Sequence, residues 1–429
     1  MNKDSNQTSK RSKSAFPPAV VIPADRPASL GIARSLGRRG IKVYEVDTDA
    51  NAIGMASRYV TPRPIPSADG SDEQRLEYLL RLGKELGEAV LYPLRDNDVL
   101  LCSKYRAELQ PYYRYVMSDH ETMTNVLTKD GLHKIAAKYN IPSPRVIWAN
   151  SLEEIEQIGD RLPFPVVLKP VFSPSWLQDD IAAIVREDHL SGPSKVVFCP
   201  DINRLLEMYK KISVYDPRMI IEEYIPGEDS SLLYFCFYLN RQSRILASFA
   251  GIKERILPVG FGSATFVRSF YDSKLEEASL ELLSAVEYKG LGGVEFKRDS
   301  RDDTFKLIEF NARLGMWDSY GARCGVDIPY VSYQDALGLK VEPEFQYRNG
   351  VRWIDFQRDV RAFIIYRKRG KLTFWRWLRS LIGEKEWAFF EWDDWKPAWI
   401  SFLQLVNRQR KGSQTRPTSA EEKRIGVQE

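Results

Sequence analysis

The chain has 429 residues and a formal net charge of +4, with 43% hydrophobic and 28% charged residues. This composition is enough to build a sizeable core and excludes a disordered or fibrous chain, while the length suggests two to four domains. The near-neutral charge gives no support to a nucleic-acid partner, because such proteins normally have a larger basic excess.

Histidine and cysteine usage excludes several site types. The three histidines, His120, His133 and His189, lie far apart, which disfavours a histidine-based zinc hydrolase and a Ser–His–Asp triad. The four cysteines form no CxxC pair, as is usual in a reducing compartment. No segment has the ~18–20 apolar residues of a membrane-spanning helix, and the polar residues 1–18 lack the apolar core of a secretory signal. We therefore expect a disordered tail over 1–18 and a cytoplasmic protein.

Residues 19–127 alternate short apolar strands with amphipathic helices. Strands are expected at Ala19–Pro23, Ile41–Asp47 and Ala89–Pro93, and a helix from about Asp72 to Gly87. This alternation predicts a parallel, Rossmann-like sheet. The turn after the first strand is PADRPASLG rather than GxGxxG, so a substrate-binding or structural domain is favoured over dinucleotide binding.

Residues 128–340 have a different pattern of mixed strands and helices. Thr128–Arg145 is predicted to form a capped helix stopped by Pro142. The remaining segments predict a strand, an antiparallel pair and a hairpin, which lie at Pro163–Pro170, at Leu232–Leu239 with Arg244–Gly251, and at Gly292–Asp299 with Phe305–Gly315.

Residues 341–408 form an aromatic-rich extension, followed by a tail over 409–429 that we expect to be disordered. Seven of the ten tryptophans lie in the extension. The segment 361–379 has no acidic residue and contains the cations Arg367, Lys368, Arg369, Lys371 and Arg376.

A row of polar side chains marks the predicted hairpin. Glu309, Asn311 and Arg313 alternate along one strand and should share a face, next to Glu295 on the neighbouring strand. Two carboxylates and an amide oxygen are ligands suited to Mg²⁺, and an arginine can bind a phosphate. Taken alone, such a row is more often a solvated sheet face with paired charges.

The opposite side of this strand favours the metal site. We expect Leu307 on the polar face and Ile308, Phe310 and Ala312 on the apolar face. An apolar opposite face, together with two glycines on the neighbouring strand at 292 and 293, indicates that the polar row faces a cleft.

Two further segments have features of a nucleotide site. Ile220–Asp229 is an apolar strand ending in Tyr–Ile–Pro–Gly, whose backbone groups match the edge of adenine, although the segment alone favours an ordinary strand and turn. Lys169 shares a strand face with Val167, and a buried lysine is costly unless it meets an anion. Lys129 lies at a helix start, where a cation opposes the helix dipole. A bound polyphosphate would explain both lysines.

These signals, in this order, resemble the ATP-grasp superfamily from about Ala19 to Gly338, and within it the carboxylate–amine ligases near D-aspartate ligase and the biotin-carboxylase-related ligases. The resemblance implies an α/β and α+β fold, in which the Rossmann-like domain precedes a two-lobed ATP-grasp domain over 128–340 and the extension follows. It implies ATP and Mg²⁺, or Mn²⁺, as cofactors.

The resemblance also assigns residues. It implies that Lys129 and Lys169 contact the ATP phosphates and that Asp229 or Glu228 binds the ribose. It implies that the adenine binds to the backbone of Glu222, Glu223, Tyr224 and Ile225. Arg313, Lys253 and Arg255 are the expected catalytic residues, and the expected metal ligands are Glu295, Glu309 and Asn311.

One departure concerns the loop over the γ-phosphate. Many relatives have a glycine-rich loop after the second lysine, whereas this chain has KPVFSPSWLQDD at Lys169–Asp180, with Ser191–Lys195 as the nearest small-residue loop. The Walker pattern GxxxxGK[ST] is absent, so a P-loop enzyme is excluded.

The reaction that the resemblance implies is ATP-dependent amide formation through an acyl phosphate, from a small-molecule carboxylate and an amine, with amino acids as candidates. A biotin-carboxylase-like reaction with bicarbonate is the alternative within the fold. An alternative from another class rests on Lys368–Gly383, which mixes basic and aromatic residues as interfacial helices do. A membrane-docking or scaffold protein with a degenerate ATP site would have the same segment and would lie at the inner membrane surface. We favour packing of these aromatics on the ligase core.

Overall fold

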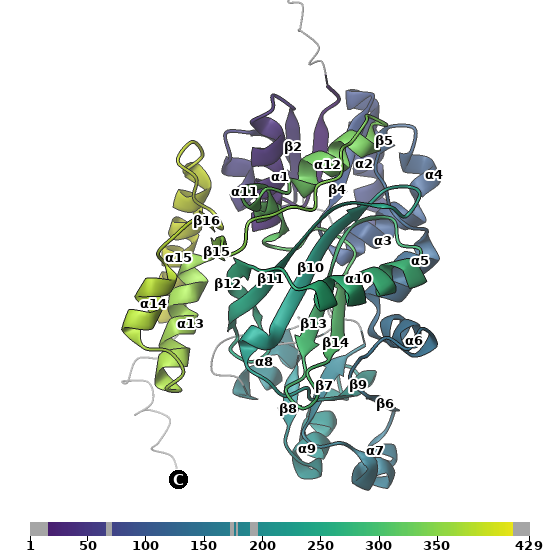
Figure 1. The fold of residues 1–429 in the computed structure, drawn as a ribbon, viewed down its shortest axis with the longest axis vertical. Coiled ribbons are helices and arrows are strands. Elements are labelled where there is room, and N and C mark those ends of the chain that lie inside the picture. The colour runs from purple at the N-terminus through teal and green to yellow at the C-terminus, as the bar shows by residue number, and fades with distance from the viewer. Residues whose placement is uncertain (1–15, 66–70, 172–175, 177–178, 189–195, 415–429) are drawn as a thin grey trace, which may run out of the picture.

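The computed structural model describes residues 16–65, 71–171, 176, 179–188 and 196–414. Three sheets follow one another along the chain, and helices of the C-terminal extension flank them on one side (Figure 1). The small-residue segment at 191–195 and the expected tails at 1–15 and 415–429 lie outside the described residues. No helix within the described part of the chain is both long enough and apolar enough to cross a membrane.

The first sheet is parallel, with strand order β3-β2-β1-β4-β5, as the Rossmann-like prediction requires. Every residue of β1 (Ala19–Ile22), β2 (Val43–Asp47) and β4 (Ala89–Pro93) is buried, because the sheet is covered on both faces. The strand order reverses at β1 and β4, and the carboxyl ends at such a point form a crevice suited to ligands. The other elements of this domain are β3 (Val60–Pro64), β5 (Tyr113–Arg114), α1 (Pro27–Gly37), α2 (Asp72–Leu86), α3 (Asp96–Lys104), α4 (Arg106–Leu109) and the 3₁₀ turn η1 (Ile53–Ala56).

The second sheet is antiparallel, with order β6-β9-β7-β8. Its elements are β6 (Val146–Ala149), α7 (Leu152–Ile158), η2 (Gly159–Arg161), β7 (Val166–Pro170), α8 (Asp179–Asp188), β8 (Val197–Cys199), α9 (Ile202–Ile212) and β9 (Met219–Glu223). One face, with Leu168 and Ile221, packs on the helices in a separate core. The alternate residues Lys169 and Glu222 therefore project from the other face.

The third sheet has seven strands in the order β14-β13-β10-β11-β12-β15-β16. The predicted antiparallel pair and hairpin are present as β10 with β11 and β13 with β14. The strands are β10 (Leu232–Leu239), β11 (Ile245–Leu257), β12 (Ser263–Ser269), β13 (Gly290–Arg298), β14 (Phe305–Asn311), β15 (Arg352–Ile354) and β16 (Lys385–Trp387).

One face of this sheet is apolar and contributes Phe235, Phe296 and Phe310 to a core. The helices α5 (His120–Leu127), α6 (Lys129–Lys138) and α10 (Ser273–Ala285) lie beside it (Figure 1). Thr128 caps α6, as expected, and accepts a hydrogen bond from the N–H of Gly131.

Two of the β-bulges in the third sheet change which of the predicted site residues share a face. In β11, Lys253 pairs with Val267 but Arg255 pairs with Phe266, so Glu254 is an extra residue. Residues paired across strands point to one face, and neighbours along a strand point to opposite faces. Arg255 therefore lies on the opposite face from Lys253.

The second bulge corrects the expected faces of β14. Glu309 pairs with Glu295 but Leu307 pairs with Phe296, which makes Ile308 the extra residue. The expectation that Leu307 shares the polar face was wrong, because Leu307 lies in the apolar core beside Phe310. Ile308, expected on the apolar face, faces the polar side.

The C-terminal extension packs along one edge of the third sheet (Figure 1). Helix α13 lies against β11 and β12. The last helix continues to Gln414, beyond the boundary expected at 408. The helices of the extension are α13 (Phe356–Lys368), α14 (Phe374–Ser380) and α15 (Lys396–Gln414), whereas η5 (Asp318–Tyr320), α11 (Gly321–Cys324) and α12 (Ile328–Ala336) precede it in the chain.

Candidate functional site

A cavity of about 1090 Å³ lies where the three sheets and the extension meet. Its wall combines the carboxyl ends of the parallel sheet, the polar faces of the second and third sheets, and residues of α13 and α15. This volume is at the upper end of the range for small-molecule sites, roughly 300–1,000 Å³.

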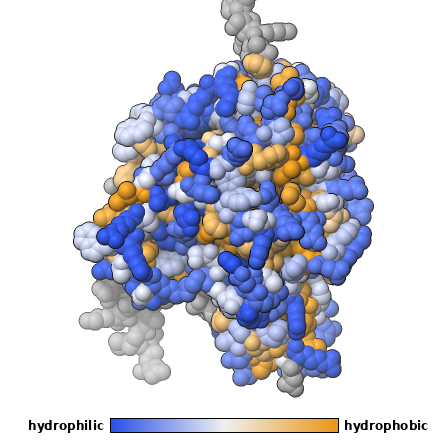
Figure 2. Space-filling model, in the orientation of Figure 1, coloured by the Kyte–Doolittle hydropathy of each residue, from blue (hydrophilic) through white to orange (hydrophobic). Residues whose placement is uncertain are grey.

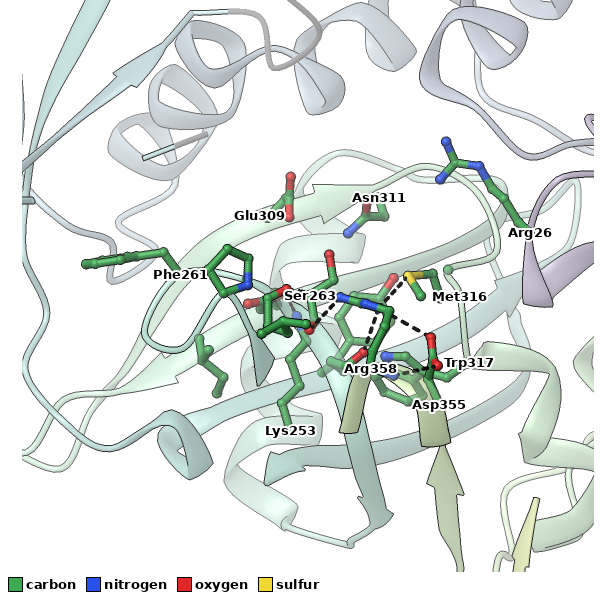
Figure 3. A pocket seen from close by; sticks show the side chains of 18 of the residues that line it. Arg26, Lys253, Phe261, Ser263, Glu309, Asn311, Met316, Trp317, Asp355 and Arg358 are labelled. Atoms are coloured by element: carbon green, nitrogen blue, oxygen red, sulfur yellow. Dashed lines mark hydrogen bonds and ion pairs between the residues drawn. The ribbon is translucent and has the colours of Figure 1, made fainter. Parts of the chain in front are cut away.

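Most of the predicted site residues line this one cavity. Glu309 and Asn311 project from the same strand into it (Figure 3). The other predicted residues on its wall are Lys129, Lys169, Glu222, Glu223, Tyr224, Ile225, Lys253, Glu295 and Arg313.

Lys169 is 9% exposed and forms an ion pair with Glu222. The two side chains sit diagonally on the face of the second sheet that points to the cavity. Burial alone would raise the pKa of Glu222, but the charge of Lys169 and the hydrogen bond from His133 bring it down to about 2. Glu222 is therefore a fixed anion that pairs with a buried lysine.

A second ion pair lies on the third sheet, where Lys253 contacts Glu295. Nearby, the ammonium of Lys129 lies 3.9 Å from the carboxylate of Glu309 and donates to the carbonyl oxygen of Ile308 at 3.3 Å. Each of these lysines thus lies next to a carboxylate of the cavity.

A residue of the first domain orients the side chain of Arg313. Its Nε donates to Asp96 at 2.7 Å, across an interface between two sheets. Burial opposes the charge, but Asp96 outweighs it and raises the pKa of Arg313. The guanidinium is therefore held at the crevice end of the parallel sheet.

The segment expected to hold adenine ends in an aromatic cluster. Tyr224 lies 5.1 Å from Phe198 and 6.1 Å from Phe261 between ring centroids, and Lys297 lies over its ring at 4.9 Å. The N–H groups of Glu223 and Tyr224 already donate to the carbonyl oxygens of Arg145 and Pro165. The rings of Tyr224 and Phe261, with Lys297 beside them, thus form this end of the cavity wall, and these two N–H groups are already paired.

Arg255 and Asp229 do not belong to the cavity wall that the structure describes. Arg255 donates two hydrogen bonds to Asp359, at 2.7 and 2.9 Å, and is 5% exposed. The expectation that Arg255 meets a phosphate or a substrate is not retained, because the bulge at Glu254 turns its side chain toward α13. Asp229 accepts a hydrogen bond from Tyr366 of α13 instead of facing the cavity.

Sequence reasoning missed Arg358, at the start of α13. It donates to the carbonyl oxygens of Leu257, Ser263 and Ala264 at 3.0–3.3 Å, which fastens the loop between β11 and β12 to the extension (Figure 3). Phe261, in that loop, lines the cavity. No local pattern links Arg358 to a loop about a hundred residues earlier, so the contact could not be found from spacing.

Arg26, in the turn after β1, also lines the cavity. Its Nε is buried and has no hydrogen-bond partner among the described residues. Burial, and next the charge of Arg313, lower the pKa of Arg26. A bound anion would satisfy this nitrogen and offset the repulsion between the two arginines.

The residues present fit a magnesium ion that is bound both by protein oxygens and by phosphate oxygens. Within the described ranges, no cluster of three or more His, Cys, Asp or Glu side chains is arranged to hold a metal by itself. Glu309, Asn311 and Glu295 supply hard oxygen donors, and Glu295 is already bound by Lys253. Mg²⁺ commonly takes one or two carboxylates and completes its shell with water and phosphate oxygens.

Comparison with known proteins agrees with this geometry. The family model described as "Carbamoyl-phosphate synthase L chain, ATP binding domain" matches residues 262–343. D-aspartate ligase of Enterococcus faecium is 25% identical over 328 residues, covering 74% of this chain and 76% of that protein.

Solved structures show the same fold. An L-amino acid ligase from Bacillus licheniformis superposes with a TM-score of 0.55 at 18% identity, over 76% of this chain and 75% of that one. A biotin carboxylase from Campylobacter jejuni has a TM-score of 0.57 at 16% identity, over 76% and 72%. The expected mixed α/β fold class is confirmed, and the chain is similar to ATP-dependent ligases with the ATP-grasp fold.

Proposed function

We propose that this protein is an ATP- and Mg²⁺-dependent ligase that joins a small-molecule carboxylate to an amine through an acyl phosphate and releases ADP. The observation that supports the proposal most is the convergence of Lys129, Lys169 and Lys253 with Glu309 and Asn311 in the cavity where the three sheets meet.

The lysines of the cavity hold the triphosphate in this proposal. Lys169 projects from the second sheet and Lys129 from the start of α6, so the phosphates lie between the two lobes. Fixed cations placed where negative charge develops lower the barrier to phosphoryl transfer without moving during the reaction. Glu222 pairs with Lys169 and orients its ammonium group.

In this proposal Mg²⁺ binds to Glu309, Asn311 and Glu295. Mn²⁺ can replace it, because both ions prefer oxygen ligands. The metal neutralises charge on the phosphate oxygens when it is bound. Glu295 joins this set when a phosphate draws Lys253 away from it, since the lysine then has another anion to contact.

The carboxylate substrate binds at the crevice end of the cavity. Arg313 and Arg26 lie at this end, and the Nε of Arg26 has only the carboxylate of Asp25 at 3.5 Å and no hydrogen bond within the described residues. An arginine fork binds a carboxylate in a bidentate manner. The relative named D-aspartate ligase makes amino acids the first substrates to examine.

A cytoplasmic location fits this function, because the four cysteines are free and buried. ATP as co-substrate and reduced thiols both suit that compartment.

The test is an ADP-release assay with Mg²⁺ and pairs of amino acids, in which the parent protein is compared with Glu309→Gln and Lys169→Met. We expect pair-dependent ADP release in the parent and its loss in both variants. ADP release that survives in both variants would remove the proposed site, and no release with any pair of amino acids or sugar acids would remove the proposed reaction.

A second candidate is carboxylation with bicarbonate, which the likeness in fold to a biotin carboxylase supports. That reaction predicts ADP release that depends on bicarbonate and needs no amine. Adding bicarbonate alone to the same assay separates the two candidates.

A further inference from the structure

Helix α14 presents apolar side chains on two opposite sides. On the inner side, Trp377 is buried, stacks on Phe363 with ring centroids 4.7 Å apart, and donates to Asp359 at 2.8 Å. On the outer side, Trp375 is 70% exposed and Ile382, in the turn after the helix, is 66% exposed. The inner side accounts for the packing of α14, and the outer side has no part in the core.

The outer apolar residues form a stripe. Trp375, Leu378 and Ile382 are three and four positions apart, which places them on one side of a helix and its following turn. Ile364 of α13 is also 47% exposed. Figure 2 shows orange and pale surface beside blue on the flank where Figure 1 places α13 and α14.

Cations are concentrated in this part of the chain, and one of them, Lys371, is paired with Glu228 at 2.9 Å. From residue 360 to residue 383 the chain has no acidic residue, whereas the whole chain is nearly balanced at +4. We call this region the basic-aromatic surface, which consists of Ile364, Trp375, Leu378, Ile382 and the exposed cations Arg367, Lys368, Arg369, Lys371, Arg376 and Arg379.

This combination fits one kind of partner better than others. A tryptophan ring and an isoleucine at a cation-rich surface match the boundary of a bilayer, where aromatic rings sit at the headgroup level and basic residues contact lipid phosphates. A nucleic acid would use the cations but leave the isoleucines in water, and a second copy of the chain would bring like charges together.

We propose that the basic-aromatic surface docks the protein on an anionic lipid bilayer, with α14 lying in the headgroup plane. The attraction is local, because the remainder of the chain contributes little net charge. This inference goes beyond the ligase function and does not depend on it.

The test is co-sedimentation of the full chain with vesicles of phosphatidylcholine alone or of phosphatidylcholine mixed equally with phosphatidylglycerol. We expect sedimentation with the mixed vesicles, little with phosphatidylcholine alone, and weaker binding as salt is raised. Both the double variant Trp375→Ser/Ile382→Ser and the double variant Arg376→Glu/Arg379→Glu should lower the apparent affinity about tenfold or more.

Matched controls lie in the second lobe, where Val214 is 79% exposed and Lys210 is an exposed cation of α9. The variants Val214→Ser and Lys210→Glu should bind vesicles like the parent. Thermal unfolding followed by circular dichroism should give the same midpoint for all variants, which shows that a loss of binding is not a loss of folding.

Three results would overturn the proposal. The first is equal binding to both vesicle types or to neither. The second is tight binding to double-stranded RNA that the apolar variant leaves unchanged, with no vesicle binding, which would indicate a nucleic-acid surface. The third is a dimer in sedimentation velocity that Trp375→Ser dissociates, again without vesicle binding, which would assign the surface to a second copy.

Discussion

Two buried ion pairs lie on opposite faces of β11 and differ in what surrounds them. Lys253 contacts Glu295 on the face that lines the cavity. Arg255 contacts Asp359 on the face covered by α13, where Thr265 and Trp377 also donate to the same carboxylate. The first pair can exchange partners with a ligand, whereas the second is enclosed by the fold.

The difference shows how one strand supplies both chemistry and stability. Buried charges must be paired on either face, because an uncompensated charge is costly away from water. We therefore expect substitutions around Lys253 to alter activity and substitutions around Arg255 to alter stability.

The largest effect is expected from Asp359→Ala. This change leaves the guanidinium of Arg255 and the N–H of Trp377 without their acceptor, and breaking a buried pair in this way costs about 3–5 kcal/mol. Urea unfolding should show the loss. The double variant Asp359→Leu/Arg255→Met should recover much of it, and an unchanged midpoint in the single variant would show that the pair is not structural.

On the cavity side, Glu309→Gln should lower ADP formation about 10²–10³-fold, because it removes a charged oxygen next to the phosphates. The urea midpoint should stay near that of the parent, since the side chain of Glu309 is 43% exposed. Loss of stability in place of activity would contradict the division between the two faces.

Asp318, deep in the cavity wall, should make stability depend on pH. Burial raises the pKa of its carboxyl from 3.8 to about 6. The folded state therefore binds the proton more tightly than the unfolded chain, and the stability from this group falls as the pH rises from about 4 to about 6.

Asp318→Asn removes this titration and should stabilise the protein by roughly 1–3 kcal/mol above pH 6, with little change at pH 4. Urea unfolding midpoints of the parent and the variant, measured at about pH 4, about pH 5 and about pH 7.5, test this prediction. A difference that does not grow with pH would show that the pKa of Asp318 is the same in the folded and the unfolded chain.

The smallest effect is expected from Glu384→Gln, which is the exposed counterpart of Asp359→Ala. Arg348 binds Glu384 with two hydrogen bonds of 2.6 and 2.8 Å, but their side chains are 61% and 42% exposed. Exposed pairs contribute about 0–1 kcal/mol, so the unfolding midpoint should barely move. A loss as large as that of Asp359→Ala would mean that burial is not what separates the two pairs.

Local patterns predicted much of the architecture. The alternation of short apolar strands with helices over residues 19–127 indicated a parallel sheet, and the alternation of Glu309, Asn311 and Arg313 indicated a shared face. Such periodicities belong to the strand itself, so they are visible before the partner strands are known.

Other parts of the site depend on segments far apart in the chain. Arg358 reaches the loop between β11 and β12, and Asp96 directs Arg313 from another sheet. The tryptophans of the extension divide in the same way, since Trp377 is 9% exposed and Trp375 is 70% exposed although both lie on α14. From composition alone, all of them were expected to pack on the ligase core.

The sequence by itself determined the order of the strands and helices and the polar row of the hairpin, because these follow from spacing along one segment. Only the tertiary structure decided which way Arg255 and Leu307 point. A β-bulge exists in the pairing of two strands, so the extra residues Glu254 and Ile308 have no signature in their own strand. Beyond each bulge, a side chain that would have pointed to one face of the sheet points to the other. For this reason Arg255 and Leu307 lie away from the cavity.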